Sequence, residues 1–381
     1  MKKKKKKTGL KKWSGVLHLW LGLASGLVVF IVALSGCIFV FQDEIQDLAY
    51  DWRFVPQQDE IFVAPALLLD QAKKVFPAAS STLVRYNTTD RPAQVYTVNA
   101  DTPYYLYFNP YSGKLTNIQN LNTDFFMVIQ QLHMYLLLPP DIGKQVVGIA
   151  TLIFILMLIT GMILWWPKKR KQLKSSLKVR WNARWRRINY DLHRSLGVYC
   201  SLLALVLAIT GLGFSYEWVD DGLYELVNLG TDSSEDHAIP QITSEKSKQT
   251  GVAINRAFKK TQELLPQSEM YFVSASGTDD AILTGAYPNA LAFDHQSNFY
   301  FHPKTGKLLQ SDYYNDKSAG LQLQEMKYGL HTGQYFGIIG KFIAFFVSLF
   351  IAGLPISGFL LWWGRRKKKA PIPHLKTAKN T

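Results

Sequence analysis

The sequence is poor in cysteine. Its 381 residues include only Cys37 and Cys200, and both lie in apolar segments. A disulfide framework in the polar regions is therefore excluded, and the lack of a Cys-x-x-Cys-His motif excludes covalently attached haem. Glycine-rich phosphate loops, a Ser-His-Asp order and a His-Glu-x-x-His motif are also absent in a convincing context, so nothing in the sequence indicates hydrolysis.

Acidic residues are missing from three short, strongly basic segments. Residues 1–12, 167–187 and 364–381 hold 25 of the 43 Lys and Arg residues and no Asp or Glu. Each segment adjoins an apolar run, and short basic segments beside membrane spans stay in the cytoplasm. The formal charge of +15 therefore indicates membrane topology, and we expect no nucleic-acid partner.

Four apolar runs are long enough to cross a bilayer, which takes ~20 residues. They cover residues 16–41, 144–166, 195–216 and 338–363. Tryptophan pairs end the second and fourth runs beside basic residues, as is typical of the membrane interface. The segment Leu34–Cys37 resembles a lipoprotein cleavage box, but its apolar run is longer than a signal segment of ~7–15 residues, so we expect the first span to be retained.

These runs predict a membrane α-helical bundle of four transmembrane helices, with both termini inside and two large loops outside. We divide the chain into a basic N-terminus (1–15), a first span (16–42), a first outer domain (43–130), an interfacial segment with the second span (131–166), a basic inner loop (167–187), a third span (188–216), a second outer domain (217–330), an interfacial segment with the fourth span (331–363) and a basic tail (364–381).

The sequence repeats itself. The dipeptide Leu-His occurs four times, each time ahead of an apolar run. When these histidines are aligned in pairs, a hydroxyl residue followed by glycine recurs at matching places further along each helix. The matches are His18 with His193, Ser35-Gly36 with Thr210-Gly211, His133 with His331, and Thr160-Gly161 with Ser357-Gly358. In the first pair the small residues fall on one helical face.

The outer loops repeat as well. The stretch "YYLYFNPYSGKLTN" around Phe108 matches "SNFYFHPKTGKLLQ" around Phe301, and each predicts a strand, a turn with Pro and Gly, and a second strand. A helix-like stretch precedes each one, "APALLLDQAKKVF" and "AINRAFKKTQELL". The chain is therefore predicted to be two pseudo-symmetric helix–outer domain–helix repeats, with a small α+β domain in each outer loop.

This arrangement resembles the PepSY-associated transmembrane family over nearly the whole chain. The resemblance rests on the Leu-His residues that head the spans, the Pro-x-Ser/Thr-Gly-Lys-Leu turns and the Trp-Trp-basic ends. It implies two periplasmic PepSY-like domains and a location in the bacterial inner membrane. Members of this family include inner-membrane reductases that take iron from ferric siderophores in the periplasm.

The four Leu-His histidines differ in depth. From His18 to Gly36 a helix rises ~27 Å, nearly the thickness of the hydrocarbon core. We therefore expect His18 and His193 near the cytoplasmic side, and His133 and His331 near the outer side. A pseudo-twofold axis between the repeats would pair the histidines of equal depth.

Two facing imidazoles in a gap lined by Gly and Ser leave room for a flat macrocycle, and histidine is a common axial ligand of haem iron. We expect His18 and His193 to bind an inner haem b, and His133 and His331 to bind an outer haem b. Zinc or copper bound by the same imidazoles is the alternative, although the two cysteines and sparse buried carboxylates offer few further ligands.

Three basic residues near the predicted haems are weaker candidates. Lys144 and Lys341 could pair with propionates of the outer haem, and Arg194 with those of the inner haem; for each, anchoring at the membrane interface is the alternative. The other histidines lack the Leu-His context and are read as surface or tail residues: His237, His295, His302 and His374.

Together with the resemblance, these features predict an oxidoreductase, a ferric siderophore reductase that contains haem. It would accept electrons from quinol or a cytoplasmic reductase and pass them across the lipid bilayer to a ferric siderophore in the periplasm. Reduction weakens such a chelate because hard oxygen donors prefer Fe(III). The alternative is a non-enzymatic PepSY-domain membrane protein that binds or regulates periplasmic partners or assists transport.

Overall fold

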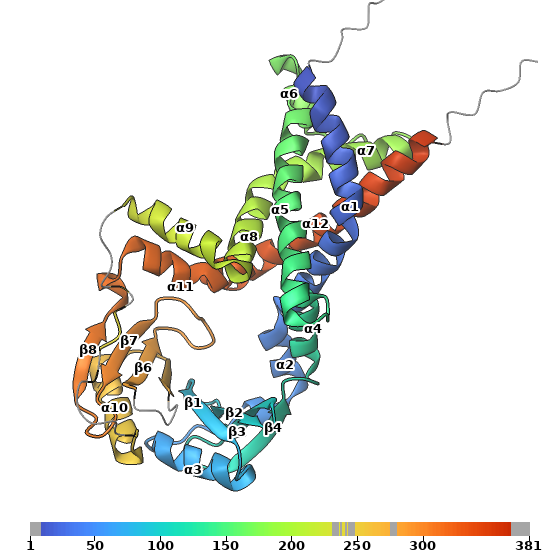
Figure 1. Ribbon diagram of the computed structural model, residues 1–381. Coiled ribbons are helices and arrows are strands. Elements are labelled where there is room, and N and C mark those ends of the chain that lie inside the picture. Colours follow the sequence, from blue (N-terminus) through green and yellow to red (C-terminus); the bar gives the residue numbers. More distant parts are fainter. Residues whose placement is uncertain are drawn as a thin grey trace, which may run out of the picture. The chain divides into compact units, whose positions relative to one another are not determined.

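A computed structural model describes residues 9–230, 236, 238–240, 242, 248–274 and 280–366. The chain divides into two compact units (Figure 1). The helical unit consists of residues 1–37, 133–208 and 345–381, and the sheet unit consists of residues 38–132 and 209–344. Each unit therefore contains chain from both sequence repeats.

Long apolar helices dominate the helical unit. Three of them are long and apolar enough to cross a membrane: α1 (Gly9–Phe39), α5 (Pro140–Trp165) and α12 (Gly337–Arg366). The first, second and fourth predicted spans are thus present as helices, and α1 begins seven residues before the predicted position 16. Between α5 and the third span lie the short helices η2 (Arg170–Gln172) and α6 (Leu173–Ser176).

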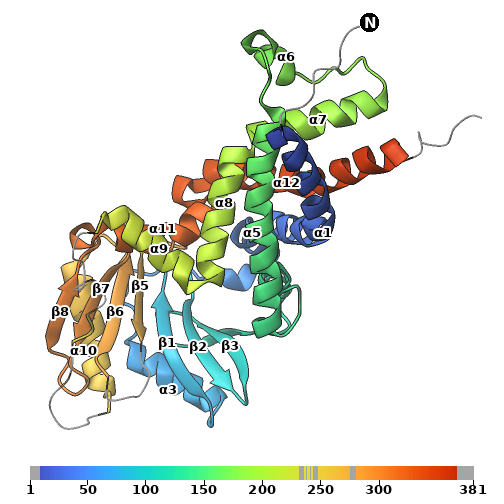
Figure 2. The same ribbon diagram turned by 45° about the horizontal axis from the view of Figure 1, so that its top comes forward.

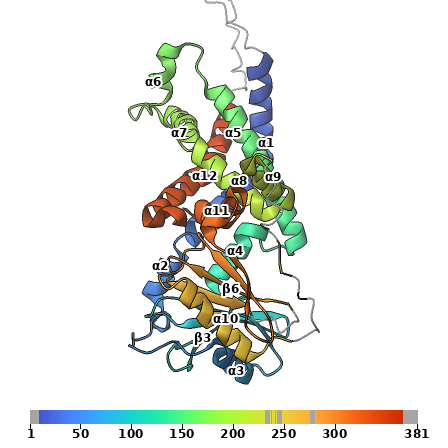
Figure 3. The same ribbon diagram turned by 90° about the vertical axis from the view of Figure 1, so that its left-hand side faces the viewer.

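The third predicted span, residues 188–216, is not one continuous helix. It is built from α7 (Trp185–Tyr199) and α8 (Ser201–Ser215), which meet at an angle of 61° around Cys200, a bend visible in Figure 3. The Ser201 hydroxyl donates a 2.8 Å hydrogen bond to the Val198 carbonyl and so competes with the helical ladder at the break. The prediction of a single helix was wrong because it rested on apolar length alone.

Small residues form the contacts between the helices of the helical unit. Ala33, Cys200, Ala204 and Ala352 are buried in one cluster with larger aliphatic side chains. Small side chains let helix backbones approach closely in lipid, where no hydrophobic force drives helices together. Within the described residues both cysteines are free and buried, as expected from the lack of a disulfide framework.

A single antiparallel sheet forms the core of the sheet unit. Its strand order is β4-β3-β2-β1-β5-β6-β7-β8 (Figure 2). The strands are β1 (Ser80–Tyr86), β2 (Ala93–Asn99), β3 (Thr102–Phe108), β4 (Leu115–Asn120), β5 (Met270–Ser274), β6 (Ile282–Tyr287), β7 (Ser297–Phe301) and β8 (Leu308–Asp312). Helices α3 (Pro65–Val75) and α10 (Gly251–Leu264) pack against it through a core that includes Leu68, Val84, Phe258 and Phe299.

The two outer domains are not separate. Strands β1 and β5 pair from Leu83↔Ser274 to Tyr86↔Tyr271, so the two four-stranded halves share one sheet. The sequence predicted a small α+β domain in each outer loop, and the structure adds that the two loops contribute to one continuous sheet. Each half alone would leave β1 or β5 as an unpaired edge, and joining them removes both edges.

The repeated strand turns agree in detail. In both turns a glycine adopts positive φ, +68° at Gly113 and +67° at Gly306, and a register shift precedes it on the incoming strand. The Asn109 amide donates to the Lys114 carbonyl, just as the His302 amide donates to the carbonyl five residues further on. The prediction of matching strand–turn–strand motifs is confirmed.

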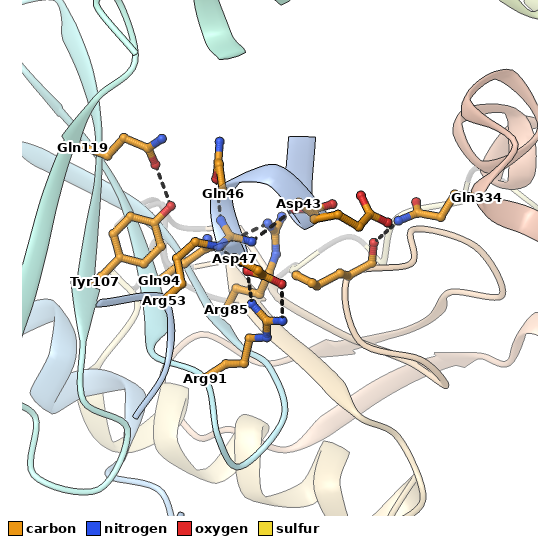
Figure 4. A network of polar contacts seen from close by, with 12 residues as sticks. Asp43, Gln46, Asp47, Arg53, Arg85, Arg91, Gln94, Tyr107, Gln119 and Gln334 are labelled. Carbon is orange, nitrogen blue, oxygen red and sulfur yellow. Dashed lines mark hydrogen bonds and ion pairs between the residues drawn. The ribbon is translucent and has the colours of Figure 1, made fainter. Parts of the chain in front are cut away.

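Helices and ion pairs complete the sheet unit. An ionic network centres on Asp47, which accepts two hydrogen bonds from Arg91 (2.7 and 2.6 Å) and one from Arg53 (2.5 Å) (Figure 4). The remaining elements are α2 (Gln42–Ala49), η1 (Asp51–Arg53), α4 (Phe125–Tyr135), which continues into the helical unit, α9 (Glu217–Asn228), η4 (Tyr314–Asp316), α11 (Ala319–Thr332) and η5 (Gln334–Phe336).

Candidate functional site: four anchored histidines

The first histidine, His18, lies on α1 of the helical unit and contacts α5. Its Nδ1 atom lies 3.0 Å from the hydroxyl oxygen of Thr160. The next residue on α5 is Gly161, where an added Cβ would lie 3.2 Å from the His18 ring. Glycine therefore gives the imidazole its space, while the neighbouring hydroxyl fixes its orientation.

The same arrangement recurs around His193 on α7. Its Nδ1 atom lies 2.8 Å from the Ser357 hydroxyl on α12, and a Cβ at Gly358 would lie 3.3 Å from its ring. One turn earlier on α7, Asn189 donates a 3.1 Å hydrogen bond to the Ser357 carbonyl. Ser357 is therefore fixed from both its side chain and its backbone.

His133, at the end of α4, repeats the pattern in the opposite direction. Its Nδ1 atom lies 2.8 Å from the Val32 carbonyl and 3.3 Å from the Ser35 hydroxyl, both on α1. A Cβ at Gly36 would lie 3.2 Å from the ring. Within the first repeat, α1 thus places His18 beside Thr160-Gly161 of α5 and places Ser35-Gly36 beside His133 of α4.

His331, on α11 of the sheet unit, completes the set. Its Nδ1 atom lies 2.9 Å from the Thr210 hydroxyl on α8, and a Cβ at Gly211 would lie 3.2 Å from the ring. The Phe214 ring contacts this imidazole edge-on at a centroid distance of 5.8 Å. All four Leu-His dipeptides therefore meet a Ser/Thr-Gly dipeptide, a pairing that sequence reasoning missed although it had aligned both motifs.

At two of the four sites, the hydrogen bonds of the hydroxyl group indicate the tautomer of the imidazole. Thr160 donates its one hydroxyl proton to the Leu156 carbonyl at 2.8 Å, and Ser357 donates to the Leu354 carbonyl at 2.9 Å. Each hydroxyl can then only accept from its histidine, so Nδ1 carries the proton. The lone pair of Nε2 is consequently the one available to a metal.

The structure brings His18 and His193 together. Their ring centroids are 6.3 Å apart and their planes are nearly perpendicular, at 87°. With a metal–nitrogen bond of ~2.0 Å and a ring centroid roughly 1.1 Å behind the nitrogen, two imidazoles on opposite sides of one ion have centroids about 6.2 Å apart. The observed separation therefore fits two axial ligands of a single metal ion.

The surroundings of this pair bear on which metal fits. Among the residues that the structure describes, no group of three or more His, Cys, Asp or Glu side chains could hold a metal ion. Zinc in proteins takes three or four protein ligands, so two imidazoles alone are too few. Haem brings four nitrogens of its own and needs only the two axial ligands. The donor set therefore fits haem better than zinc.

His133 and His331 belong to different units, so their pairing stays a prediction. Of the predicted propionate partners, Lys341 forms a 2.8 Å ion pair with Glu44, and Arg194 donates to the Ser175 carbonyl at 3.1 Å. No ion pair or hydrogen bond of the Lys144 side chain occurs within the described chain. Their propionate roles stay predictions.

The other histidines separate into two groups. His295 pairs with the buried Asp294 at 2.6 Å, and the ring of His302 accepts from the Lys304 amide at 3.2 Å within the strand turn. His237 and His374 lie outside the described residues.

Sequence reasoning missed a buried polar cluster beside His193. The Asp191 side chain is fully buried on α7 and forms an ion pair of 3.0 Å with Arg187. One Asp191 oxygen, the Arg194 Nε and the Ser195 hydroxyl have no hydrogen-bond partner among the described residues. The signal was present in the sequence as an acidic residue two positions before a Leu-His histidine in an otherwise basic stretch.

The long apolar helices define a membrane protein, and its helical unit carries three of the four anchored histidines. Residues 16–365 match the family described as the PepSY-associated TM region. The chain belongs to this family, and the resemblance seen in the sequence is confirmed. A search of curated proteins finds no match.

Proposed function

We propose that this membrane protein is a haem-containing reductase of the bacterial inner membrane. It takes electrons from quinol or a cytoplasmic reductase and delivers them to a ferric siderophore in the periplasm. The observation that supports the proposal is the adjacent pair His18 and His193, with ring centroids 6.3 Å apart and both Nδ1 atoms beside hydroxyl groups.

His18 and His193 would hold the inner haem b, and His133 and His331 the outer one. When bound, haem would supply one-electron redox chemistry, and two histidines for each haem are a ligand set that suits electron transfer. The chain positions the ligands: Thr160 and Ser357 hold the imidazole orientations, while Gly161 and Gly358 leave room for the rings.

Besides carrying the histidines, the apolar helices exclude water and ions from the proposed electron path across the membrane. The histidines near each side receive their orientation from uncharged hydroxyls and carbonyls. Neutral anchors avoid the cost of burying an extra charge in the bilayer. In this orientation the basic segments are cytoplasmic and the sheet unit is periplasmic, consistent with the inside preference of Lys and Arg.

The pyridine haemochrome assay on full-length protein from haem-replete cells tests this proposal. We expect two haem b groups per chain and a reducible Soret band. His18→Ala and His193→Ala should each remove one haem and, being partners, should give the same residual spectrum. Colourless wild-type protein would overturn the proposal and favour the non-enzymatic alternative, a PepSY-domain protein that binds periplasmic partners.

A further inference from the structure

A cavity of about 530 Å³ lies in the helical unit between α7 and the end of α12. Its α7 wall includes Trp185, Arg186 and Asn189, and its α12 wall includes Leu360 and Arg365. Trp185, Arg186 and Arg365 belong to the basic segments, Asn189 and Leu360 belong to the third and fourth spans, and none of the four Leu-His histidines lines the cavity. It is therefore a separate site from the paired imidazoles.

The charge of this cavity has one sign. Three arginines line it, Arg186, Arg187 and Arg365, and no acidic residue does. Arg187 is paired with Asp191, but within the described chain Arg186 and Arg365 have neither an ion pair nor a side-chain hydrogen bond. Two guanidinium groups without an ion pair in the lining of one cavity suit a phosphate chemically, because arginine binds phosphate through paired N–H donors.

The rest of the lining is apolar and aromatic. Trp185 and Trp363 are 64% and 47% exposed, and Leu360 is 42% exposed at the end of a membrane-spanning helix. Tryptophan favours the boundary between headgroups and acyl chains, and leucine favours the acyl chains. The cavity thus offers cationic groups to a phosphate and, beside them, apolar surface to hydrocarbon.

We infer that this cavity binds an anionic phospholipid from the leaflet on the basic side of the membrane. Arg186 and Arg365 bind the phosphate, Trp185 and Trp363 lie at the glycerol level, and Leu360 contacts an acyl chain. A zwitterionic lipid carries its own cation, which the arginines repel, so anionic headgroups are preferred. The inference does not depend on haem.

The bound lipid also has a structural consequence. It joins α7 to α12, which Asn189 and Ser357 already connect by a 3.1 Å hydrogen bond. Because binding to the folded state alone stabilises that state by mass action, anionic lipid should raise the melting temperature of the protein. A lipid at this place braces the helix that carries His193.

Native mass spectrometry of delipidated full-length protein tests the inference, with dioleoyl phosphatidylglycerol and dioleoyl phosphatidylcholine as probes. We expect one phosphatidylglycerol to bind more tightly than phosphatidylcholine. Arg186→Gln and Arg365→Gln should each weaken phosphatidylglycerol binding roughly fivefold, the effect of about 1 kcal/mol per basic residue near anionic lipid. Arg180→Gln, an exposed arginine of the same loop that does not line the cavity, should change nothing.

Three results would overturn the inference. The first is equal binding of the two lipids, and the second is a loss of phosphatidylglycerol binding in the Arg180→Gln control as large as in the two cavity variants. The third is displacement of the lipid by millimolar glycerol 3-phosphate, which would identify a soluble phosphate compound as the ligand. Arg186 and Arg365 are exposed, so both variants should fold, and a melting curve of each without lipid checks this point. Loss of the lipid-induced rise in melting temperature in the two cavity variants alone would support the inference.

Discussion

The two sequence repeats have the same arrangement around their histidines, but the helices that carry those histidines differ. In the first repeat α1 is one helix of 31 residues, whereas in the second the equivalent span is broken by 61° between α7 and α8. Yet His18 and His193, on these dissimilar helices, hold Nδ1 at 3.0 and 2.8 Å from a hydroxyl that precedes a glycine.

This difference separates shared chemistry from local elaboration. The features present in both repeats are the histidine, its hydroxyl anchor, the glycine and the strand turn. The second repeat alone has the bend, Asn189 and the buried Asp191 beside its inner histidine. We therefore expect changes at shared features to have equal effects in both repeats, and changes at the others to affect one.

The largest effect is expected at the outer histidines. His133→Ala and His331→Ala should each abolish ferric siderophore reduction, because each removes one axial ligand of the proposed outer haem. The measurement is the rate of Fe(II) formation from a ferric siderophore by reduced protein. His302→Asn is the matched control, since it installs the residue that the first repeat has at the same turn position, Asn109. Normal reduction in either alanine variant would exclude the outer site.

The glycines facing the inner histidines come next. Gly358→Leu should displace His193 and remove the inner haem, since even a Cβ would lie 3.3 Å from the ring. Gly161→Leu should do the same to His18. Gly353→Leu on α12 is the control, because nothing lies within 4 Å of its Cβ position. The haemochrome assay measures the haem content of all three variants. An unchanged haem content in Gly358→Leu would contradict the proposed geometry.

The hydroxyl anchors should have a smaller effect. Thr160→Val and Ser357→Ala leave a ligand Nδ1–H without its acceptor, and losing such an outer partner typically weakens metal binding about 10- to 100-fold. We expect haem to transfer to an excess of a haem-scavenging protein faster by that factor. Thr160→Ser and Ser357→Thr keep the hydroxyl and should restore the wild-type rate. If they fail to do so, side-chain packing and not the hydrogen bond explains the effect.

The smallest effect concerns the sheet unit. Burial raises the pKa of Asp47, but hydrogen bonds from Arg91 and Arg53 outweigh it and hold the pKa below its ordinary value. The ionised Asp47 carboxylate therefore stabilises the folded state fully above the ordinary carboxyl pKa of about 4. This stabilisation is lost as pH falls through the lower pKa that Asp47 has in the folded state.

Asp47→Asn should remove about 2 kcal/mol at pH 7, the size of a charged hydrogen bond, and should flatten the fall of stability at acid pH. Thermal unfolding of the full-length protein at pH 7 and at lower pH measures both effects. Asp59→Asn, at an exposed position without an ion pair in the described chain, should leave the curve unchanged. Equal destabilisation by both variants would argue against a specific role for the Arg53–Asp47–Arg91 network.

Sequence patterns predicted the elements better than their pairings. Apolar length predicted α1, α5 and α12, and the turn residues predicted strands β3, β4, β7 and β8. They could not predict that β1 pairs with β5, because a pair of residues such as Leu83 and Ser274 is remote in the chain and carries no local signal. The bend at Cys200 was missed for a similar reason, since a lone serine after it also occurs in straight helices.

The candidate site was predictable in part. The four histidines stand out because ionisable groups at membrane spans are rare. Their anchors Ser35, Thr160, Thr210 and Ser357 were visible as small residues, but which hydroxyl meets which imidazole depends on helix packing. The unexpected acid, Asp191, is buried only because α7 packs against neighbouring helices of its unit.

Electron paramagnetic resonance of the oxidised, full-length protein can show whether His18 and His193 bind one iron, because it distinguishes iron with two imidazole ligands from iron with one. We expect low-spin ferric haem, and we expect His18→Ala and His193→Ala each to convert the same portion of the signal to high spin or to remove it. A high-spin signal in the wild-type protein, or a change in only one of the two variants, would contradict the claim that these two histidines bind one iron.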